Sequence, residues 1–453
     1  MRRLLPLILL LFAAALGVFA MFMLNERDDA AGWTTESPRA REAFDQALEA
    51  LRKRYIGDAV KQLDRALELD PSFAMARLYR DLLDPTVSHE DKLSTVQAVD
   101  TSRLNSREAA LSRAIRALFE GDPQKAREEI DACLKAHPDD PYLRSIACED
   151  DWDRLDWKAA EHCYQDLIAR HPNWVEAQNR LGFLAMSAGR FQVAEDRFEA
   201  YRFVAPDQAT PYSSLAELAM LRGDLATAEV QLDRALAIKP DFCDALLHRV
   251  SLRSFERRFA QAREALFTLS ETPACAAALP AKDLCAARMR IAYLEADYEG
   301  AWQASEACPE DRMWSALAHR TALLTGRGQA SIALEQAVAA DLDNGGEAMV
   351  PAMQQAIEGL LLSFEGERLL AAGHAAEAAQ RFEDSDALNR YWGWRHGWTF
   401  KLYNQVDRIQ ALERAGKQDE AARVRSALDR VNPIIESLFA PGATAVADLA
   451  ADR

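Results

Sequence analysis

The stretch ATPYSSLAELAMLRGDLATAEVQLDRALAIKPDF, residues 209–242, has the pattern of two short helices joined by a turn. Apolar residues in each half are spaced three, four or seven apart, which predicts one apolar face per helix. They are Tyr212, Leu215, Ala216 and Ala219 in the first half, and Ala228, Leu232 and Ala235 in the second. Gly223 ends the first helix, because glycine tolerates a positive φ, and Pro240 ends the second. Such a short pair cannot bury its apolar face alone, so neighbouring pairs must stack.

The same pattern recurs along the chain with a period of 34 residues. The recurring positions are Pro138, Pro172, Pro206 and Pro240; Ala126, Ala160, Ala194, Ala228 and Ala262; and Gly121, Gly189 and Gly223. A fixed period of this length predicts a solenoid of helical repeats.

These residues resemble the tetratricopeptide repeat family. The repeat at 175–208 matches best, through Leu181, Gly182, Ala185, Gly189, Ala194, Phe198, Tyr201 and Pro206. The resemblance implies an all-α solenoid superhelix of helix-turn-helix repeats, and a protein or peptide partner on its concave surface. The resulting division of the chain is a membrane anchor at 1–24, a linker at 25–39, an N-terminal repeat-like region at 40–106, five tandem repeats at 107–274, degenerate helical repeats at 275–358, C-terminal repeats at 359–439 and a flexible tail at 440–453.

The N-terminus predicts one transmembrane helix. Residues 4–24 carry no charge, follow Arg2 and Arg3, and precede acidic residues. A helix of this length spans about 31 Å, enough to cross a bilayer, and the basic flank stays in the cytoplasm. We therefore expect a single-pass protein of the bacterial inner membrane with its repeats in the periplasm. A signal peptide cleaved near Met21 and a buried core helix are the alternatives.

The net charge of the chain limits the class of partner that it can bind. The 453 residues carry a net charge of −17, which argues against nucleic acid as a partner because phosphate binding needs a basic face.

The seven cysteines form no CxxC pair. A disulfide between Cys275 and Cys285 is allowed by their spacing, and free buried thiols are expected for the other five.

No signature of catalysis or of a cofactor is present. The sequence lacks a nucleophile elbow, a metalloprotease motif and a phosphate loop. His162 and Cys163 are neighbours, but adjacent helical residues point about 100° apart, which suits no shared metal. We expect no enzyme, no cofactor and no metal site.

The resemblance also implies which residues line the groove. In this family they are the second, fifth, ninth, twelfth and thirteenth residues of each first helix. The residues carried over as protein-binding are Tyr142, Glu149, Trp152, Asp153, Asn179, Phe183, Met186, Ser213, Glu217 and Met220, with Ser145, Glu176, Ser187, Thr210 and Leu221 at the remaining places. This mixed acidic and apolar set predicts a basic, partly apolar partner.

A tryptophan cluster, RYWGWRHGW at 390–398, precedes the last repeat. Trp394 and Trp398 continue an apolar stripe that reaches Leu412, which predicts a helix from about residue 390 with both side chains in the core. Trp392 lies on another face, where it would be core or an exposed patch for a partner or the membrane interface.

The sequence thus predicts a membrane-anchored scaffold that binds another protein in envelope assembly or regulation. Two other functions remain open. One is an enzyme with an unrecognised site in residues 275–400, and the other is an envelope protein that self-associates as a homodimer.

Overall fold

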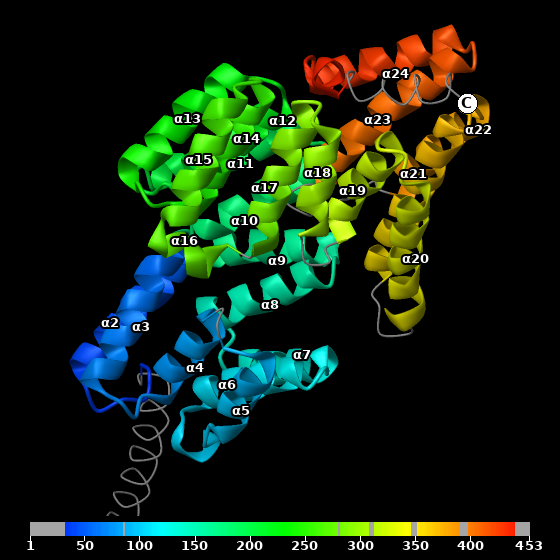
Figure 1. The fold of residues 1–453 in the computed structure, drawn as a ribbon. Helices are drawn as coiled ribbons and strands as arrows, with labels where there is room; N and C mark the ends of the chain where they lie inside the picture. The colour runs from blue at the N-terminus through cyan, green and yellow to red at the C-terminus, as the bar shows by residue number, and fades with distance from the viewer. Residues whose placement is uncertain are drawn as a thin grey trace, which may run out of the picture. The chain divides into compact units, whose positions relative to one another are not determined.

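The computed structural model describes residues 32–84, 87–279, 281–307, 312–345, 351–388 and 397–439. Within these ranges the chain forms helices and no strand, which confirms the predicted all-α fold (Figure 1). The chain divides into two compact units. Unit 1 runs to Arg52 and from Asp58 to Ala147, and unit 2 comprises residues 53–57 and 148–453.

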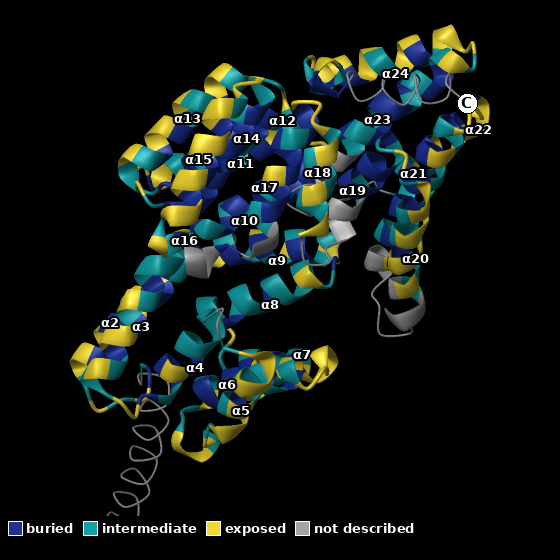
Figure 2. Cartoon of the chain, viewed as in Figure 1, coloured by how far each residue is buried: buried dark blue, intermediate teal, exposed yellow. Residues whose placement is uncertain are grey.

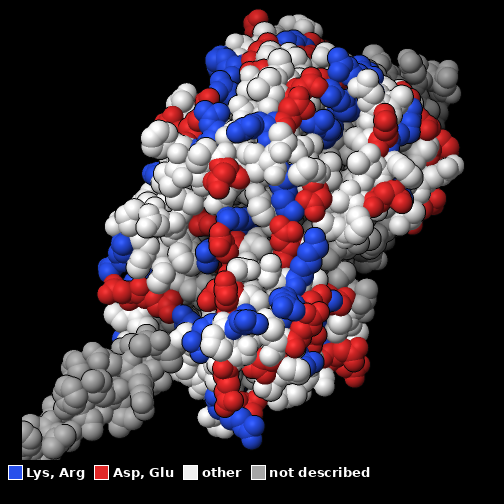
Figure 3. All heavy atoms as spheres, turned by 90° about the vertical axis from the view of Figure 1, so that its left-hand side faces the viewer, with Lys and Arg blue, Asp and Glu red and all other residues white. Residues whose placement is uncertain are grey.

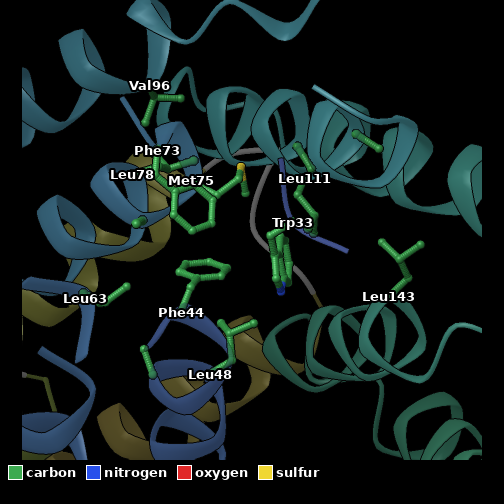
Figure 4. Close-up of a cluster of buried hydrophobic side chains, with 14 of the residues drawn as sticks. Trp33, Phe44, Leu48, Leu63, Phe73, Met75, Leu78, Val96, Leu111 and Leu143 are labelled. Atoms are coloured by element: carbon green, nitrogen blue, oxygen red, sulfur yellow. The ribbon is translucent and has the colours of Figure 1, made fainter. Parts of the chain in front are cut away.

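Unit 1 is a set of short helices around one apolar core. The helices are α2 (Pro38–Arg52), α3 (Ile56–Leu69), α4 (Ala74–Leu83), α5 (His89–Ala98), the 3-10 turn η1 (Thr101–Arg103), α6 (Ser106–Phe119), α7 (Pro123–Ala136) and the first part of α8 (Pro141–Asp153). Figure 4 shows side chains from most of these helices converging on Phe44 and Trp33.

Trp33 belongs to the segment predicted as a linker, yet its side chain is 4% exposed. Its ring lies 4.7 Å from that of Phe44, and its Nε1 donates a hydrogen bond to Asp45 at 2.8 Å. The next residue, Thr34, donates its backbone N–H to the buried carboxylate of Glu108 at 2.7 Å. Trp33 and Thr34 are therefore held in unit 1, and α2 already begins at Pro38, within the segment predicted as a linker.

Unit 2 continues the helix pairs. After the end of α8 come α9 (Trp157–Arg170), α10 (Glu176–Ser187), α11 (Phe191–Val204), α12 (Thr210–Leu221), α13 (Leu225–Ile238), α14 (Cys243–Phe255), α15 (Phe259–Glu271), α16 (Pro273–Ala278), α17 (Ala281–Leu294), α18 (Tyr298–Glu306), α19 (Arg312–Leu324), α20 (Gly328–Gly345), α21 (Pro351–Ala371), α22 (Ala375–Leu388), α23 (Gly397–Arg414) and α24 (Gln418–Val431).

The 34-residue period is visible in the helix boundaries. The second helices of five consecutive pairs, α7, α9, α11, α13 and α15, begin at residues 123, 157, 191, 225 and 259. An aspartate caps several of them: Asp224 accepts a hydrogen bond from the backbone N–H of Thr227 at 3.0 Å, which satisfies one free donor of the first turn. The fixed period therefore sets both the start of each helix and its position in the stack.

The turn before each of these helices needs one residue in the left-handed conformation. The predicted glycines, Gly121, Gly189 and Gly223, have φ between 73° and 79°. Leu155 and Arg257 take the two intervening places of the same register, with φ of 58° and 56°. A left-handed side chain costs roughly 1–2 kcal/mol, so these two positions carry strain that glycine would avoid.

Helix pairs also continue through residues 281–345, where the sequence register is broken, as α17 with α18 and α19 with α20. The described residues of the first helices, α17 and α19, are mostly buried, and the exposed residues lie mainly on α18 and α20 (Figure 2). Among the described helices, none is long and apolar enough to span a bilayer. The predicted anchor at 1–24 and the tail at 440–453 lie outside the described residues.

Candidate protein-binding surface

The predicted groove residues lie on α8, α10 and α12, the first helices of three successive pairs. We call this set the inner face. Tyr142, its first member, belongs to unit 1, where its ring lies 5.8 Å from Trp33 and its hydroxyl hydrogen-bonds that of Tyr79. Burial raises the pKa of Tyr142 well above its ordinary value. Tyr142 therefore packs within unit 1.

The end of α8 and the start of α10 are joined by an ion pair. Arg180 donates from Nε and Nη2 to the two oxygens of Glu149 at 2.8 and 2.5 Å, and Tyr164 donates its hydroxyl to Glu149 at 2.8 Å. The guanidinium of Arg180 also lies 5.0 Å from the ring centre of Trp152. Glu149 and Arg180 keep 38% and 33% of their side chains exposed, so this part of the inner face is open to solvent.

Asp153 is the exposed carboxylate beside this pair. Desolvation by the surrounding chain, and then the nearby charge of Glu149, raise the pKa of Asp153 to about 6. A cation bound next to Asp153 would offset the repulsion between the carboxylates of Asp153 and Glu149. Glu149, Trp152 and Asp153 thus place two carboxylates beside an aromatic ring at the end of α8.

Farther along the inner face, polar side chains bond to one another across neighbouring helices. The hydroxyl of Ser214 donates to Asn179 at 2.7 Å, so α12 is tied to α10. Ser213 Oγ lies 3.0 Å from His248 Nδ1, and His248 Nε2 lies 3.3 Å from Glu217, so α12 is tied to α14. Asn179, Ser213, Met186 and Met220 are each at most 9% exposed. Phe183 is half-buried, with its ring 5.2 Å from that of Phe198.

The C-terminal helix pairs contain a buried cluster of charges. Arg320 on α19 pairs with Glu367 on α21 and with Asp407 on α23. His319, fully buried, has Nδ1 2.6 Å from Glu367 and Nε2 3.0 Å from Glu335 on α20. This cluster was not predicted from the sequence. In the sequence, this cluster shows only as charged residues within otherwise apolar helices. Which of these residues pair depends on how the helices stack.

The Ser213, His248 and Glu217 arrangement has the residue types of a hydrolytic triad. Ser213 is, however, 3% exposed, and its own backbone N–H donates to the carbonyl of Ala209 at 3.1 Å. A serine nucleophile needs free N–H donors nearby to stabilise an oxyanion. Ser213 and Glu217 therefore tie α12 to His248 of α14, and the N–H of Ser213 itself is not available to an oxyanion.

The cysteine pairing differs from the prediction. Cys243 forms a disulfide with Cys275, and Cys148 forms one with Cys163. The Cys275–Cys285 bridge that the spacing allowed is not formed, because the stacking of α14 on α16 places Cys243 5.4 Å from Cys275, Cα to Cα. The expectation of free thiols is also wrong for Cys148, Cys163 and Cys243. Cys133 is a buried free thiol, as expected.

The tryptophan cluster falls largely outside the described residues. Trp392 and Trp394 are not among them, and α23 begins at Gly397, so the predictions for this cluster stay predictions. In the described part of the chain, no group of three or more histidine, cysteine or carboxylate side chains could hold a metal ion.

Charge is evenly mixed on the face drawn in Figure 3, where lysine and arginine lie among aspartate and glutamate. No large basic field of the kind that binds nucleic-acid backbones covers that face.

No family model matches the sequence, and no curated protein is similar to it. Solved structures with some likeness include a tetratricopeptide repeat protein from Parabacteroides merdae (15% identity, 62% of this chain and 98% of that one, TM-score 0.40) and yeast Tom70 (16%, 71% and 68%, TM-score 0.41). A third is the human IFIT1 dimer with m7Gppp-AAAA (14%, 89% and 92%, TM-score 0.43). Likeness at this level carries no information on function.

The fold itself defines the class. Unit 2 is an array of stacked helix pairs. The 34-residue period and the left-handed turn residues of residues 123–271 resemble those of tetratricopeptide repeats.

Proposed function

We propose that this protein is a membrane-anchored scaffold that binds a basic, partly apolar protein segment on the open part of its inner face. The observation that carries the proposal is the group formed by Glu149, Trp152, Asp153 and Arg180. In this group the exposed carboxylate of Asp153 lies near the ring of Trp152. The charge of the neighbouring Arg180 is already neutralised by Glu149. A lysine or arginine of the partner would pair with Asp153, and an adjacent apolar side chain would cover Trp152.

The buried positions of the inner face limit the size of the partner's contact. Asn179, Ser213 and Ser214 use their polar atoms to tie helices together, so a partner cannot bond them without breaking those contacts. We therefore restrict the proposed contact to the end of α8 and the partly exposed Arg180 of α10.

The proposed location is the exported side of a bacterial inner membrane. Residues 4–24 provide the anchor, and the disulfides Cys148–Cys163 and Cys243–Cys275 fit an oxidising compartment, because such bonds rarely persist in a reducing cytosol. A reporter enzyme active only outside the cytoplasm, fused after residue 30, should be active. Release of the repeats in soluble form with a new N-terminus near Met21 would instead indicate a cleaved signal.

The binding proposal is tested by photocrosslinking in native membranes. A photoreactive residue at position 153 of the full-length chain should give a discrete crosslinked protein, and one at position 196, exposed on α11, should not. Asp153→Lys should reduce capture of the same protein at least fivefold, while the matched Asp196→Lys should leave it unchanged. Equal yields at both positions, or equal capture by both variants, would overturn the proposal. A crosslink to a second copy of this chain would favour self-association.

A further inference from the structure

The last described segment of unit 2, residues 432–439, folds back onto helix pairs that precede it by about 200 residues. Asn432 is 2% exposed, and its side-chain amide donates to the carbonyl of Leu221, the last residue of α12, at 2.8 Å. The asparagine oxygen accepts from the backbone N–H of Ile434 at 3.1 Å and so begins a short helical turn. One asparagine thus satisfies a free carbonyl of a distant helix and starts the segment that docks there.

Arg257 holds the other end of the segment. Its guanidinium donates to the carbonyl of Ser437 at 3.0 Å and to that of Leu438 at 3.4 Å. These are main-chain acceptors at the C-terminal end of a helical turn, where a cation is favoured by the helix dipole. In this segment Arg257 therefore bonds main-chain carbonyls. It occupies the left-handed turn position that Gly121, Gly189 and Gly223 occupy in other repeats.

The strain at Arg257 has a parallel elsewhere in unit 2. Arg54 is also left-handed, with φ of 61°, and its Nε lies 2.5 Å from the carboxylate of Asp244, 190 residues away. In both turns the chain carries a strained arginine whose side chain reaches a distant segment. Strained residues persist where the surrounding structure gains from their position.

Apolar side chains fill the space between these two polar contacts. Ile435, Leu438 and Phe439 stand at i, i+3 and i+4 and are at most 7% exposed. The ring of Phe439 lies 3.9 Å from Tyr403 and 6.4 Å from Tyr293. Gly223 lies so close to the segment that an added Cβ would come within 2.7 Å of the Asn432 oxygen.

We propose that the turn 221–223, Arg257 and the tyrosines Tyr293 and Tyr403 form a second binding site, for a short helical segment with Asn-Pro at its start and apolar side chains at i, i+3 and i+4. Residues 432–439 are its resident occupant. A partner segment of the same chemistry binds there when the resident segment is displaced. The site is separate from the inner face of α8 and α10.

The test uses the full-length protein in mild detergent and a labelled peptide of residues 430–442. In the wild type, the tethered segment has an effective concentration on the order of millimolar and competes with the peptide. The double variant Leu438→Asp/Phe439→Asp should free the site and bind the peptide at least tenfold more tightly than the wild type. A peptide carrying the same two substitutions should not bind.

Arg257→Gly, introduced into the double variant, should weaken peptide binding at least fivefold although glycine relieves the backbone strain. Ala296→Gly is the matched control, because Ala296 is left-handed at φ of 66°. It should leave peptide binding unchanged. If the double variant keeps its helical signal and binds no peptide, the contact is a fixed part of the fold and the proposal is wrong.

Should the double variant fail to fold, Asn432→Ala keeps the apolar packing and loosens one end of the segment. A fluorophore at residue 441 should then become more mobile on addition of the unlabelled peptide. No change at saturating peptide would equally overturn the proposal.

Discussion

Cys243 and Cys275 form a disulfide that joins the first turn of α14 to α16 across 32 residues of sequence. Cross-linking a loop of this length lowers the entropy of the unfolded chain, and the expected stabilisation is about 3.7 kcal/mol. Cys243→Ser should therefore lower the free energy of unfolding of unit 2 by about that amount, measured by chemical denaturation without reductant.

The control for this prediction is Cys133, a buried free thiol. Cys133→Ala should cost no more than about 1 kcal/mol, and added reductant should destabilise Cys133→Ala as strongly as the wild type. If reductant leaves the wild type unchanged, the disulfides do not contribute to its stability.

The buried imidazole of His319 makes stability depend on pH. Burial alone would lower its pKa, but hydrogen bonds and charge from Glu335 and Glu367 outweigh burial and raise it. Because the folded pKa lies above the unfolded value of about 6.5, the stabilisation is fully present below pH 6.5 and is lost as pH rises through the folded pKa. Denaturation midpoints should therefore fall as pH is raised from 6 toward 9.

His319→Gln should remove most of this dependence and cost about 1.5–3 kcal/mol at pH 6, because it removes two charge-assisted hydrogen bonds while Glu367 keeps Arg320 and Glu335 keeps Arg368. His374, with 57% of its side chain exposed, provides the matched control. His374→Gln should change stability by less than about 0.5 kcal/mol. A pH profile of His319→Gln that parallels the wild type would assign the dependence to other groups.

Gly366 on α21 tests the close packing within a helix pair. An added Cβ would lie 2.7 Å from Cε1 of Phe382 on α22. Gly366→Ala should therefore lower the free energy of unfolding by about 1–3 kcal/mol, even though alanine favours helices. Gly328, where an added Cβ would meet no atom within 4 Å, should accept alanine with no loss of stability. Recovery of stability in Gly366→Ala/Phe382→Leu would confirm that the ring is the obstacle.

The fold was predictable because it depends on local, repeated constraints. The spacing of Gly121, Gly189 and Gly223 predicted where first helices end, and the helix boundaries keep that spacing. Leu155 and Arg257 occupy the same turn position without the glycine that would have marked it. Periodicity in the sequence thus predicts the repeat, but the strained members of the register are recognisable only from their backbone conformation.

The site was less predictable because it depends on contacts between distant repeats. Family positions placed Asn179 and Ser213 on the inner face, but their burial follows from bonds to Ser214 and His248 on neighbouring helices. Likewise, nothing local to Cys243 indicates Cys275 as its partner, since the stacking of helices decides the pairing. Residues 432–439 reach Leu221 only because the intervening helix pairs curve back.

The proposed role of Asp153 predicts how partner binding depends on pH. Its pKa is about 6 in the free protein, so at pH 7.5 it is mostly ionised and at pH 5 mostly neutral. A cationic partner binds the ionised form and lowers this pKa further, so capture of the crosslinked protein should weaken as pH falls from 7.5 to 5. Asp153→Asn, which keeps the size of the side chain, should bind weakly at both values and show a flattened profile. Measuring both proteins at constant ionic strength separates protonation from screening. A wild-type profile that is flat, or one that persists unchanged in Asp153→Asn, would remove Asp153 from the binding surface.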